Sequence, residues 1–270
     1  MAPRQGIDPQ GENFPAYPLY KERLVNVRKI VGLVIACGLL VGASAAPVTA
    51  KKARSRVPAW GGEDAPIRPG ASLNGSCTFN FVFYTPGTAT RAPKAYIGTA
   101  GHCTDKLGEP AELPGVGAVG KVVYDSDLVK GEYNAVDFSL IELAPAMVSQ
   151  TNPTVLGWGG PKRVATVEDF AEGDRVDVYG YGLLVGETEQ TRPRSGVLFS
   201  WTEQEYLADM PAVNGDSGAP LLHNETGAAL GIISRWNIDV PPSTDRGPLV
   251  VWILEALDAA GFDVRLATVE

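Results

Sequence analysis

The chain has 270 residues, of which 44% are hydrophobic and 20% are charged, a composition that excludes a fibrous or largely disordered protein. Its formal net charge of -8 argues against a nucleic-acid groove, so we expect no nucleic-acid partner. The 31 glycines and 21 prolines interrupt the chain often, and this favours many short strands joined by turns.

Residues 1–50 are predicted to be a signal peptide with a polar N-terminal extension. The extension, residues 1–20, is followed by the basic run KERLVNVRK and then by uncharged residues from Ile30 to Ala46. Small residues at 43–45 and 48–50 fit a cleavage site. A basic region, an apolar region and small residues in this order are typical of secretory signals, so we expect a secreted protein.

An uncleaved membrane anchor is the alternative to a cleaved signal. It would hold the protein on the outer face of the membrane, although the apolar run is short for a full span. The extension is long for a signal, which suggests a translation start near Leu24 or Val25. Cys37, in VIAC, loosely resembles a lipoprotein attachment site, but the apolar run continues past it. Residues 51–65 are expected to be a linker or a short propeptide.

The remaining chain is predicted to form short strands. Segments that alternate apolar and polar residues, or that are rich in aromatic and β-branched residues, predict half-buried strands. A stretch rich in proline and glycine, residues 144–161, separates two groups of them. Near the C-terminus, ILEALDAAG predicts a helix for which Gly261 is a suitable C-cap. Short strands with turn signals between them indicate a sandwich or a barrel. The predicted strands are 77–84, 94–100, 120–125, 136–143, 175–182, 196–201 and 228–236.

Two cysteines, Cys77 and Cys103, remain after removal of the signal. An even pair in an exported chain predicts one disulfide, and two free buried thiols are the alternative. The closed loop of roughly 27 residues would stabilise the fold by roughly 3.5 kcal/mol in the chain-entropy model.

Three short motifs carry residues suited to catalysis. In NGDSGAP, residues 214–220, two glycines around Ser217 indicate a tight bend that presents its hydroxyl. His102 lies in TAGHC, at the end of a predicted strand. Asp137 opens the apolar segment DFSLIEL, where an aspartate is costly unless it has partners. Taken alone, each has a structural explanation: a turn, a structural or solvated histidine, and a strand-end turn residue.

The three motifs occur once each, in the order His, Asp, Ser, and together they resemble the TAxHC, DxxL and GDSGxP of chymotrypsin-like (trypsin-family) serine proteases of the bacterial secreted type. The resemblance spans about residues 66–261. It implies an all-β fold of two six-stranded antiparallel β-barrels with the active site between them, plus a C-terminal helix. The protease domain would cover 66–270, with the first barrel at about 76–145, the second at about 162–252 and the helix at about 252–261.

The resemblance further implies a serine endopeptidase that hydrolyses peptide bonds through an acyl-enzyme intermediate. A serine hydroxyl is a poor nucleophile without an adjacent base, so His102 would take the proton of Ser217, and Asp137 would orient the imidazole. The backbone N–H groups of Gly215 and Ser217 match the oxyanion hole of the family. The disulfide would close the loop that carries the catalytic histidine.

The family resemblance also assigns a substrate-binding region. Ser234 matches a serine that hydrogen-bonds the buried aspartate, and segment 234–236 matches the strand that pairs with extended substrate. Trypsin-like enzymes have an aspartate at the pocket floor where this chain has Pro211, so cleavage after Lys or Arg is not implied and we expect an apolar pocket. Asp209 would reach the pocket only if the alignment shifts. The residues that match substrate-binding positions are Pro211, Ala212, Asn214, Ser234, Arg235 and Trp236.

The activation sequence of the animal enzymes, a basic residue followed by Ile-Val-Gly-Gly, is absent from this sequence. In those enzymes the new chain end pairs with the aspartate that matches Asp216. We therefore expect Asp216 to pair with an internal arginine, for which Arg68 and Arg194 are candidates, and activity to need no cleavage before Ile67.

Two other functions stay open. A non-catalytic relative would use the same double barrel as a binding module. A serine esterase of another fold would order its triad Ser, acid, His, but the only histidine after Ser217 is His223, which is too close in sequence. We assign His223 to a solvated turn without a role. Two histidines and one expected disulfide leave no zinc-type ligand set, so we expect no metal. We also expect no cofactor. The expected partner is a protein or peptide substrate, and the expected oligomeric state is a monomer.

Overall fold

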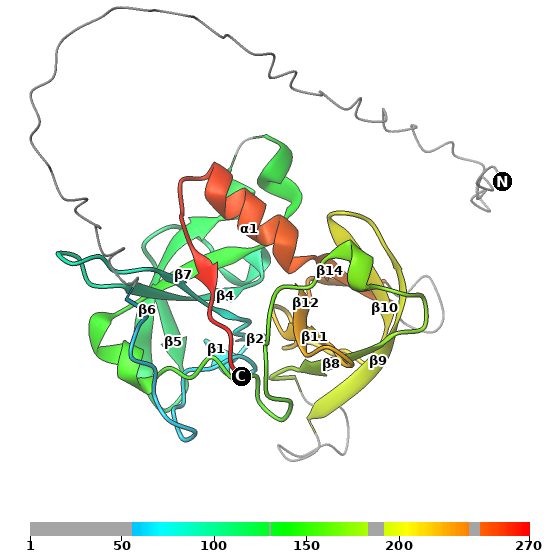
Figure 1. Ribbon diagram of the computed structural model, residues 1–270, viewed down its shortest axis with the longest axis horizontal. Coiled ribbons are helices and arrows are strands. Elements are labelled where there is room, and N and C mark those ends of the chain that lie inside the picture. The colour runs from blue at the N-terminus through cyan, green and yellow to red at the C-terminus, as the bar shows by residue number, and fades with distance from the viewer. Residues whose placement is uncertain (1–55, 130, 183–191, 238–243) are drawn as a thin grey trace, which may run out of the picture. The chain divides into compact units, whose positions relative to one another are not determined.

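The computed structural model describes residues 56–129, 131–182, 192–237 and 244–270 (Figure 1). The predicted signal peptide at 1–50 lies outside the described residues. Among the residues that are described, no helix is both long enough and apolar enough to span a bilayer.

The first sheet has six antiparallel strands in the order β15-β3-β4-β7-β6-β5. Its inward side chains alternate with outward ones, and the inward set includes Val82, Ile97, Val122 and Ile141, which form a buried cluster. The strand β15 comes from the far end of the chain and pairs with β3 at the edge of the sheet. The strands are β3 Val82–Thr85, β4 Lys94–Thr99, β5 Pro110–Leu113, β6 Gly117–Asp125, β7 Ser139–Leu143 and β15 Arg265–Leu266.

The second sheet has seven antiparallel strands in the order β12-β11-β8-β9-β10-β14-β13. A bridge between Gly231 and Leu249 links β12 to the residue after β14, so the sheet closes on itself. The buried Val176, Leu198 and Tyr206 belong to a second cluster, separate from that of the first sheet. The strands are β8 Arg175–Tyr179, β9 Pro193–Trp201, β10 Glu205–Asp209, β11 Pro220–His223, β12 Ala228–Ile232, β13 Arg235–Asn237 and β14 Thr244–Pro248.

The seventh strand corrects the expected count of six, and hydrogen bonding explains it. The segment predicted as one strand at 228–236 changes partner part of the way along. The N–H of Ile233 still donates to Ala219 O at 2.9 Å, whereas the N–H of Ser234 donates to Arg246 O at 3.2 Å. The chain therefore leaves the β11 ladder after β12 and continues as β13 beside β14.

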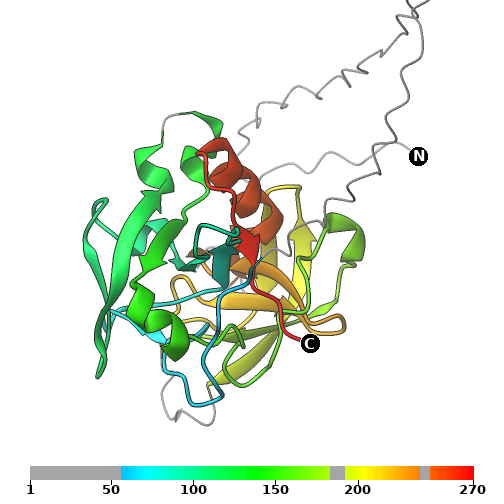
Figure 2. The same cartoon turned by 60° about the vertical axis from the view of Figure 1, so that its left-hand side comes forward.

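The helix α1, Val250–Ala259, packs against both sheets (Figures 1 and 2). Its Trp252, Ile253 and Leu257 share one hydrophobic cluster with Phe138 from the first half and Ile232 from the second. A helix of ten residues is marginal alone in water, so this burial stabilises it. It starts two residues before the predicted range and is followed by Gly261 with a φ of 88°. β1 Ser72–Leu73 and β2 Cys77–Thr78 form a small two-stranded sheet of their own, whose Leu73 and Cys77 pack in the cluster of the first sheet.

The predicted all-β fold with two antiparallel barrels and a C-terminal helix is thus confirmed. The three sequence motifs lie in segments that adjoin these strands: the turn after β4, the residues before β7, and the turn before β11.

Candidate active site

The three motif residues line one cavity although they are far apart in sequence. His102 lies in a single 3₁₀ turn, η1 Gly101–Cys103, which follows β4. Asp137 lies two residues before β7, and Ser217 lies three residues before β11. His102, Asp137 and Ser217 share the cavity with Ser234 and with the side chains of Asp127 and Arg235.

The imidazole of His102 is held by the carboxylate of Asp137. The Nδ1 atom of His102 lies 3.1 Å from Oδ1 and 3.0 Å from Oδ2 of Asp137, and the backbone N–H of His102 donates to Oδ1 at 2.9 Å. The hydroxyl of Ser234 donates to Oδ2. Asp137 is 5% exposed, so these contacts supply the partners that a buried carboxylate needs. Because Nδ1 is engaged, Nε2 is the ring nitrogen left for proton transfer.

The interaction between His102 and Asp137 shifts the pKa values of both residues. The hydrogen bond with Asp137 raises the pKa of His102 above 6.5, and burial opposes part of that rise. Burial pushes the pKa of Asp137 upward, but the hydrogen bonds from His102 and Ser234 outweigh it and hold that pKa below its usual 3.8. Asp137 therefore remains ionised when His102 is neutral, and it can stabilise an imidazolium when one forms.

The local backbone explains two residue choices around this pair. Asp137 has a φ of 50°, a left-handed conformation that aspartate tolerates better than most residues. At Gly101 a Cβ would lie 3.0 Å from Oδ1 of Asp137 and 3.0 Å from the N atom of Phe138. Glycine thus leaves room for the Asp137 carboxylate in this chain.

The turn that carries Ser217 is anchored to the first half of the chain. The N–H of Thr78 donates to Ser217 O at 2.8 Å, and the hydroxyl of Thr78 donates to Gly215 O at 2.6 Å. Gly215 and Gly218 have φ values of 103° and 89°, and a Cβ at Gly218 would lie 2.3 Å from the carbonyl oxygen of Thr78. The two glycines therefore allow the tight bend that the sequence predicted.

The backbone amides of this turn differ in their hydrogen bonding. The N–H of Asp216 donates to Val213 O at 3.0 Å. Among the described residues, the N–H groups of Gly215 and Ser217 donate to no acceptor, and no hydrogen bond joins His102 to Ser217. Two amides in one tight turn are thus left available to an anion.

Asp216 makes a buried ion pair with Arg194, as the sequence predicted for one of two arginines. The Nη1 atom of Arg194 lies 2.5 Å from Oδ2, and the Nη2 atom lies 3.3 Å from Oδ1. The N–H groups of Gly182 and Val213 donate to the same carboxylate, each at 2.9 Å. The other candidate, Arg68, donates instead to the carbonyl oxygens of Glu63 and Thr154.

The predicted disulfide between Cys77 and Cys103 is present, with Cα atoms 6.2 Å apart. It joins β2 to the turn that carries His102. The two sulfurs and a ring nitrogen of His102 lie within 4.8 Å of one another, but bonded sulfurs are not thiolate ligands for a metal.

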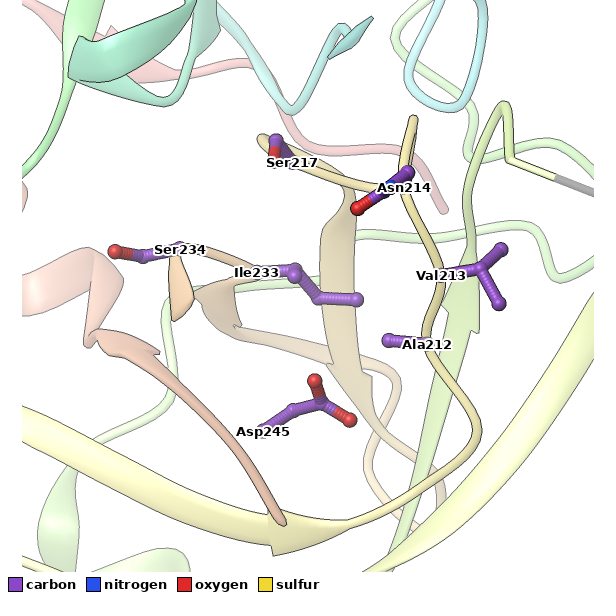
Figure 3. A pocket seen from close by; sticks show the side chains of 7 residues that line it. All are labelled: Ala212, Val213, Asn214, Ser217, Ile233, Ser234 and Asp245. Carbon is purple, nitrogen blue, oxygen red and sulfur yellow. The ribbon is translucent and has the colours of Figure 1, made fainter. Parts of the chain in front are cut away.

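A pocket opens next to Ser217 and corrects the expectation of an apolar lining (Figure 3). Asp245, on β14, lies in its wall and is 1% exposed. Sequence reasoning missed this residue because TDRGP reads as a turn and no motif marks it. The lining residues are Ala212, Val213, Asn214, Ser217, Ile233, Ser234 and Asp245.

The other residues assigned to substrate binding are distributed around this pocket. Ala212, Asn214 and Ser234 line it, and Arg235 lines the neighbouring cavity with His102. Pro211 is not among the lining residues, and its carbonyl oxygen accepts a hydrogen bond from Arg194 at 2.9 Å. Asp209 does not line the pocket either. The backbone of Trp236 lies in β13, and its side chain lies outside the part that the structure describes.

His223 is buried, which corrects its assignment to a solvated turn. It is 2% exposed, its Nε2 lies 3.1 Å from Asp174 Oδ2, and its Nδ1 lies 2.9 Å from the hydroxyl oxygen of Thr226. Its place at the end of β11 gives it a structural role in the second sheet.

Comparison with known proteins identifies the fold. No protein-family model and no curated protein matches the chain. Thermobifida fusca protease A is 20% identical, with 75% of this chain and 99% of that chain covered and a TM-score of 0.50. A Nocardiopsis protease is 19% identical, with the same coverage and TM-score. A glutamic-acid-specific serine protease that uses a histidine triad in substrate binding is 19% identical, with coverage of 76% and 100% and a TM-score of 0.50. The chain therefore has the fold of the bacterial chymotrypsin-like serine proteases.

Proposed function

We propose that the chain is a secreted serine endopeptidase in which Ser217 is the nucleophile, His102 the general base and Asp137 the group that orients and stabilises the imidazole. One observation carries this proposal: His102 is fixed through Nδ1 by a buried carboxylate, in the cavity that also contains Ser217. A protein or peptide chain is the substrate.

The reaction follows from these positions. Oγ of Ser217 attacks the carbonyl carbon of the scissile bond while its proton passes to Nε2 of His102. The oxygen of the tetrahedral intermediate becomes negative, and the free N–H groups of Gly215 and Ser217 stabilise it. His102 then gives the proton to the leaving amine as the C–N bond breaks, which leaves an acyl group on Ser217. Water, deprotonated by the same imidazole, hydrolyses the ester and restores the serine.

The Arg194–Asp216 pair supports activity without N-terminal processing. Asp216 lies between the two residues of the proposed oxyanion hole, and its carboxylate already has a buried cationic partner within the chain. The turn is therefore held without a newly cut chain end, and we propose that cleavage before Ile67 is not required. Export through residues 1–50 is part of the same proposal, and N-terminal sequencing of the secreted protein tests it. A start near residues 46–51 is expected, whereas an intact chain that stays in the membrane fraction would contradict export and cleavage.

Labelling with a fluorophosphonate tests the nucleophile. The folded wild-type protein is expected to react at Ser217, as located by peptide mass spectrometry, and to digest casein. Ser217→Ala is expected to lose both properties while it keeps the same melting temperature within about 3 °C, because the change removes one half-buried hydroxyl that makes no hydrogen bond to the described residues. A wild-type protein that is folded, carries its disulfide and yet stays unlabelled would favour the non-catalytic binding module.

A further inference from the structure

The pocket beside Ser217 contains an acidic group that the proposed reaction does not use. In Figure 3, Ser217 lies at one end of the pocket and Asp245 at the other, with Ala212 and Ile233 between them. The carboxylate of Asp245 projects from β14 into this space. A substrate side chain that enters beside the attacked carbonyl would therefore extend towards this carboxylate.

Neither carboxylate oxygen of Asp245 has a hydrogen-bond partner among the described residues. Buried carboxylates are normally paired or hydrogen-bonded, and the neighbouring Asp216 follows that rule through Arg194. Asp245 is as deeply buried as Asp216 but lacks such a partner. A group that departs from the rule at the end of an open pocket is a candidate for contact with a ligand.

The charged groups around Asp245 decide its ionisation. The pKa of Asp245 is raised to about 7, mainly by burial and also by the negative charges of Asp216 and Asp209, while the positive charge of Arg194 opposes the rise. The charge of Arg194 is already engaged by Asp216. Above pH 7 the pocket thus contains a desolvated anion without a counter-charge, and a cation that enters would supply one.

The size of the pocket limits what can enter. Its cavity volume is about 40 Å³, far below the roughly 300–1,000 Å³ of pockets that hold a whole small ligand, so it suits only a narrow group such as one side chain. Its walls at Ala212, Val213 and Ile233 are apolar, which suits the methylene stem of a long side chain whose charged end reaches a carboxylate.

We propose that Asp245 is the primary specificity determinant, and that the pocket takes the cationic side chain of a lysine or arginine on the acyl side of the cleaved bond. The anion comes from β14, and Pro211 does not line this pocket, so the absence of an aspartate at 211 does not exclude basic substrates. The inference rests on the proposed function, because it identifies the pocket as the site beside an attacked carbonyl.

The first experiment compares peptide substrates that differ only at this position: arginine, its uncharged isostere citrulline, leucine and glutamate. At pH 8 we expect kcat/KM for arginine to exceed that for citrulline by roughly 10²-fold, the range for a buried charge pair. Asp245→Asn should bring the ratio close to 1, and the matched control Asp209→Asn should leave it within about threefold. The ratio of the two kcat/KM values should fall as the pH drops below 7, because Asp245 becomes protonated. The titration of His102 affects both substrates equally and therefore does not change the ratio.

A preference for leucine or glutamate, or an arginine preference that survives in D245N, would overturn the proposal. The second experiment is independent of catalysis and uses benzamidine, a small aromatic cation. Calorimetry should show binding to the wild type and to S217A, with at least about 30-fold weaker binding to D245N. Circular dichroism should show that D245N is folded.

The two experiments separate the two proposals. Benzamidine binding that depends on Asp245, in a protein that no fluorophosphonate labels, would reject the protease and keep the cation pocket. Labelling of Ser217 without benzamidine binding or arginine preference would keep the protease and reject the assignment of Asp245.

Discussion

Arg194 and Asp216 form an ion pair in which the side chains are 4% and 1% exposed, and Asp216 immediately precedes Ser217 in the same turn. The guanidinium also donates to the carbonyl oxygens of Pro211 and Gly182, so one side chain ties together three segments of the second half. The pair thus connects the proposed nucleophile turn to β9, where Arg194 lies.

Removing the cation from this pair is expected to be severe. Arg194→Met leaves the carboxylate of Asp216 buried without its counter-charge, which should lower the free energy of unfolding by about 3–5 kcal/mol. Urea denaturation at pH 7.5 measures the loss. The double variant R194M/D216N removes both charges and should recover part of the stability. Its activity should stay low, because Asp216 also fixes the amides of Gly182 and Val213. An R194M protein as stable as the wild type would contradict a structural role for the pair.

The pH dependence of activity should reflect the raised pKa of His102. Because the base must be neutral and its pKa lies above 6.5, the acid limb of kcat/KM should have its midpoint above pH 6.5. Asp137→Asn removes the interaction that raises this pKa, so its midpoint should move to lower pH while kcat falls by roughly 10⁴-fold. Stopped assays from pH 5 to 9 with a neutral peptide substrate, which avoids the titration of Asp245, check both effects. A midpoint that is unchanged in D137N would disprove the coupling.

Ser234→Ala should separate positioning from stability. The change removes a hydrogen bond to the carboxylate of Asp137, which makes that carboxylate more basic and its bond to the imidazolium stronger. We expect kcat to fall by about tenfold or more, KM to change little for a neutral substrate, and the acid limb to shift to higher pH. Ser234→Thr keeps a hydroxyl and is the matched control. A purely structural serine would leave the position of the acid limb unchanged.

The disulfide should contribute a measurable part of the stability. Replacing both cysteines, C77S/C103S, opens the loop that contains β4, and the chain-entropy model predicts a loss of about 3.5 kcal/mol. Thermal unfolding of the variant and of the wild type, with and without reductant, measures it. Reductant should destabilise the wild type and have no effect on the variant, so equal responses would rule out a stabilising bridge.

Asp245→Asn should stabilise the protein, and more so at alkaline than at acid pH. The folded state raises the pKa of this carboxyl from 3.8 to about 7, so the folded protein holds the proton more tightly than the unfolded chain. Its contribution is therefore most favourable below pH 4 and is lost as the pH rises from about 4 to 7. The gain from D245N should grow over this interval to a few kcal/mol, roughly, and then level off. Chemical denaturation at pH 4, 6 and 8 tests the trend, and a gain that is the same at all three values would contradict it.

The fold could be predicted where local pattern and tertiary pairing agree. The aromatic and β-branched residues of KAYIGTA predicted a strand at 94–100, and β4 spans Lys94–Thr99. The strand β14 was missed because Asp, Gly and Pro disfavour strands, yet pairing on both sides, with β10 and β13, holds it extended. The two residues of β15 carry too little pattern to be recognised, and their pairing with β3 depends on the folded core.

Some residues of the candidate site could likewise be predicted from the sequence, and others could not. The sequence indicated His102, Asp137 and Ser217 because three motifs with residues suited to one reaction occur once each, in the order His, Asp, Ser, and the structure places all three residues in one cavity. No motif marks Asp245, because the features that single it out are its burial, its missing hydrogen-bond partners and the pocket beside it, and these appear only in the folded structure. Arg194 could be predicted in part, since the sequence analysis expected an arginine partner for Asp216 but did not decide between Arg68 and Arg194.

The position of β15 ties the completion of the first sheet to the synthesis of the second. Arg265 and Leu266 pair with Tyr84 and Phe83, so the outer edge of β3 stays uncovered on the ribosome until the whole second sheet and α1 have been made. An open strand edge is a template for aggregation. A nascent fragment that ends before β15 would therefore expose this edge. Because β15 is made last, the first sheet depends on the end of the chain for protection against aggregation, just as the candidate site depends on residues from both halves.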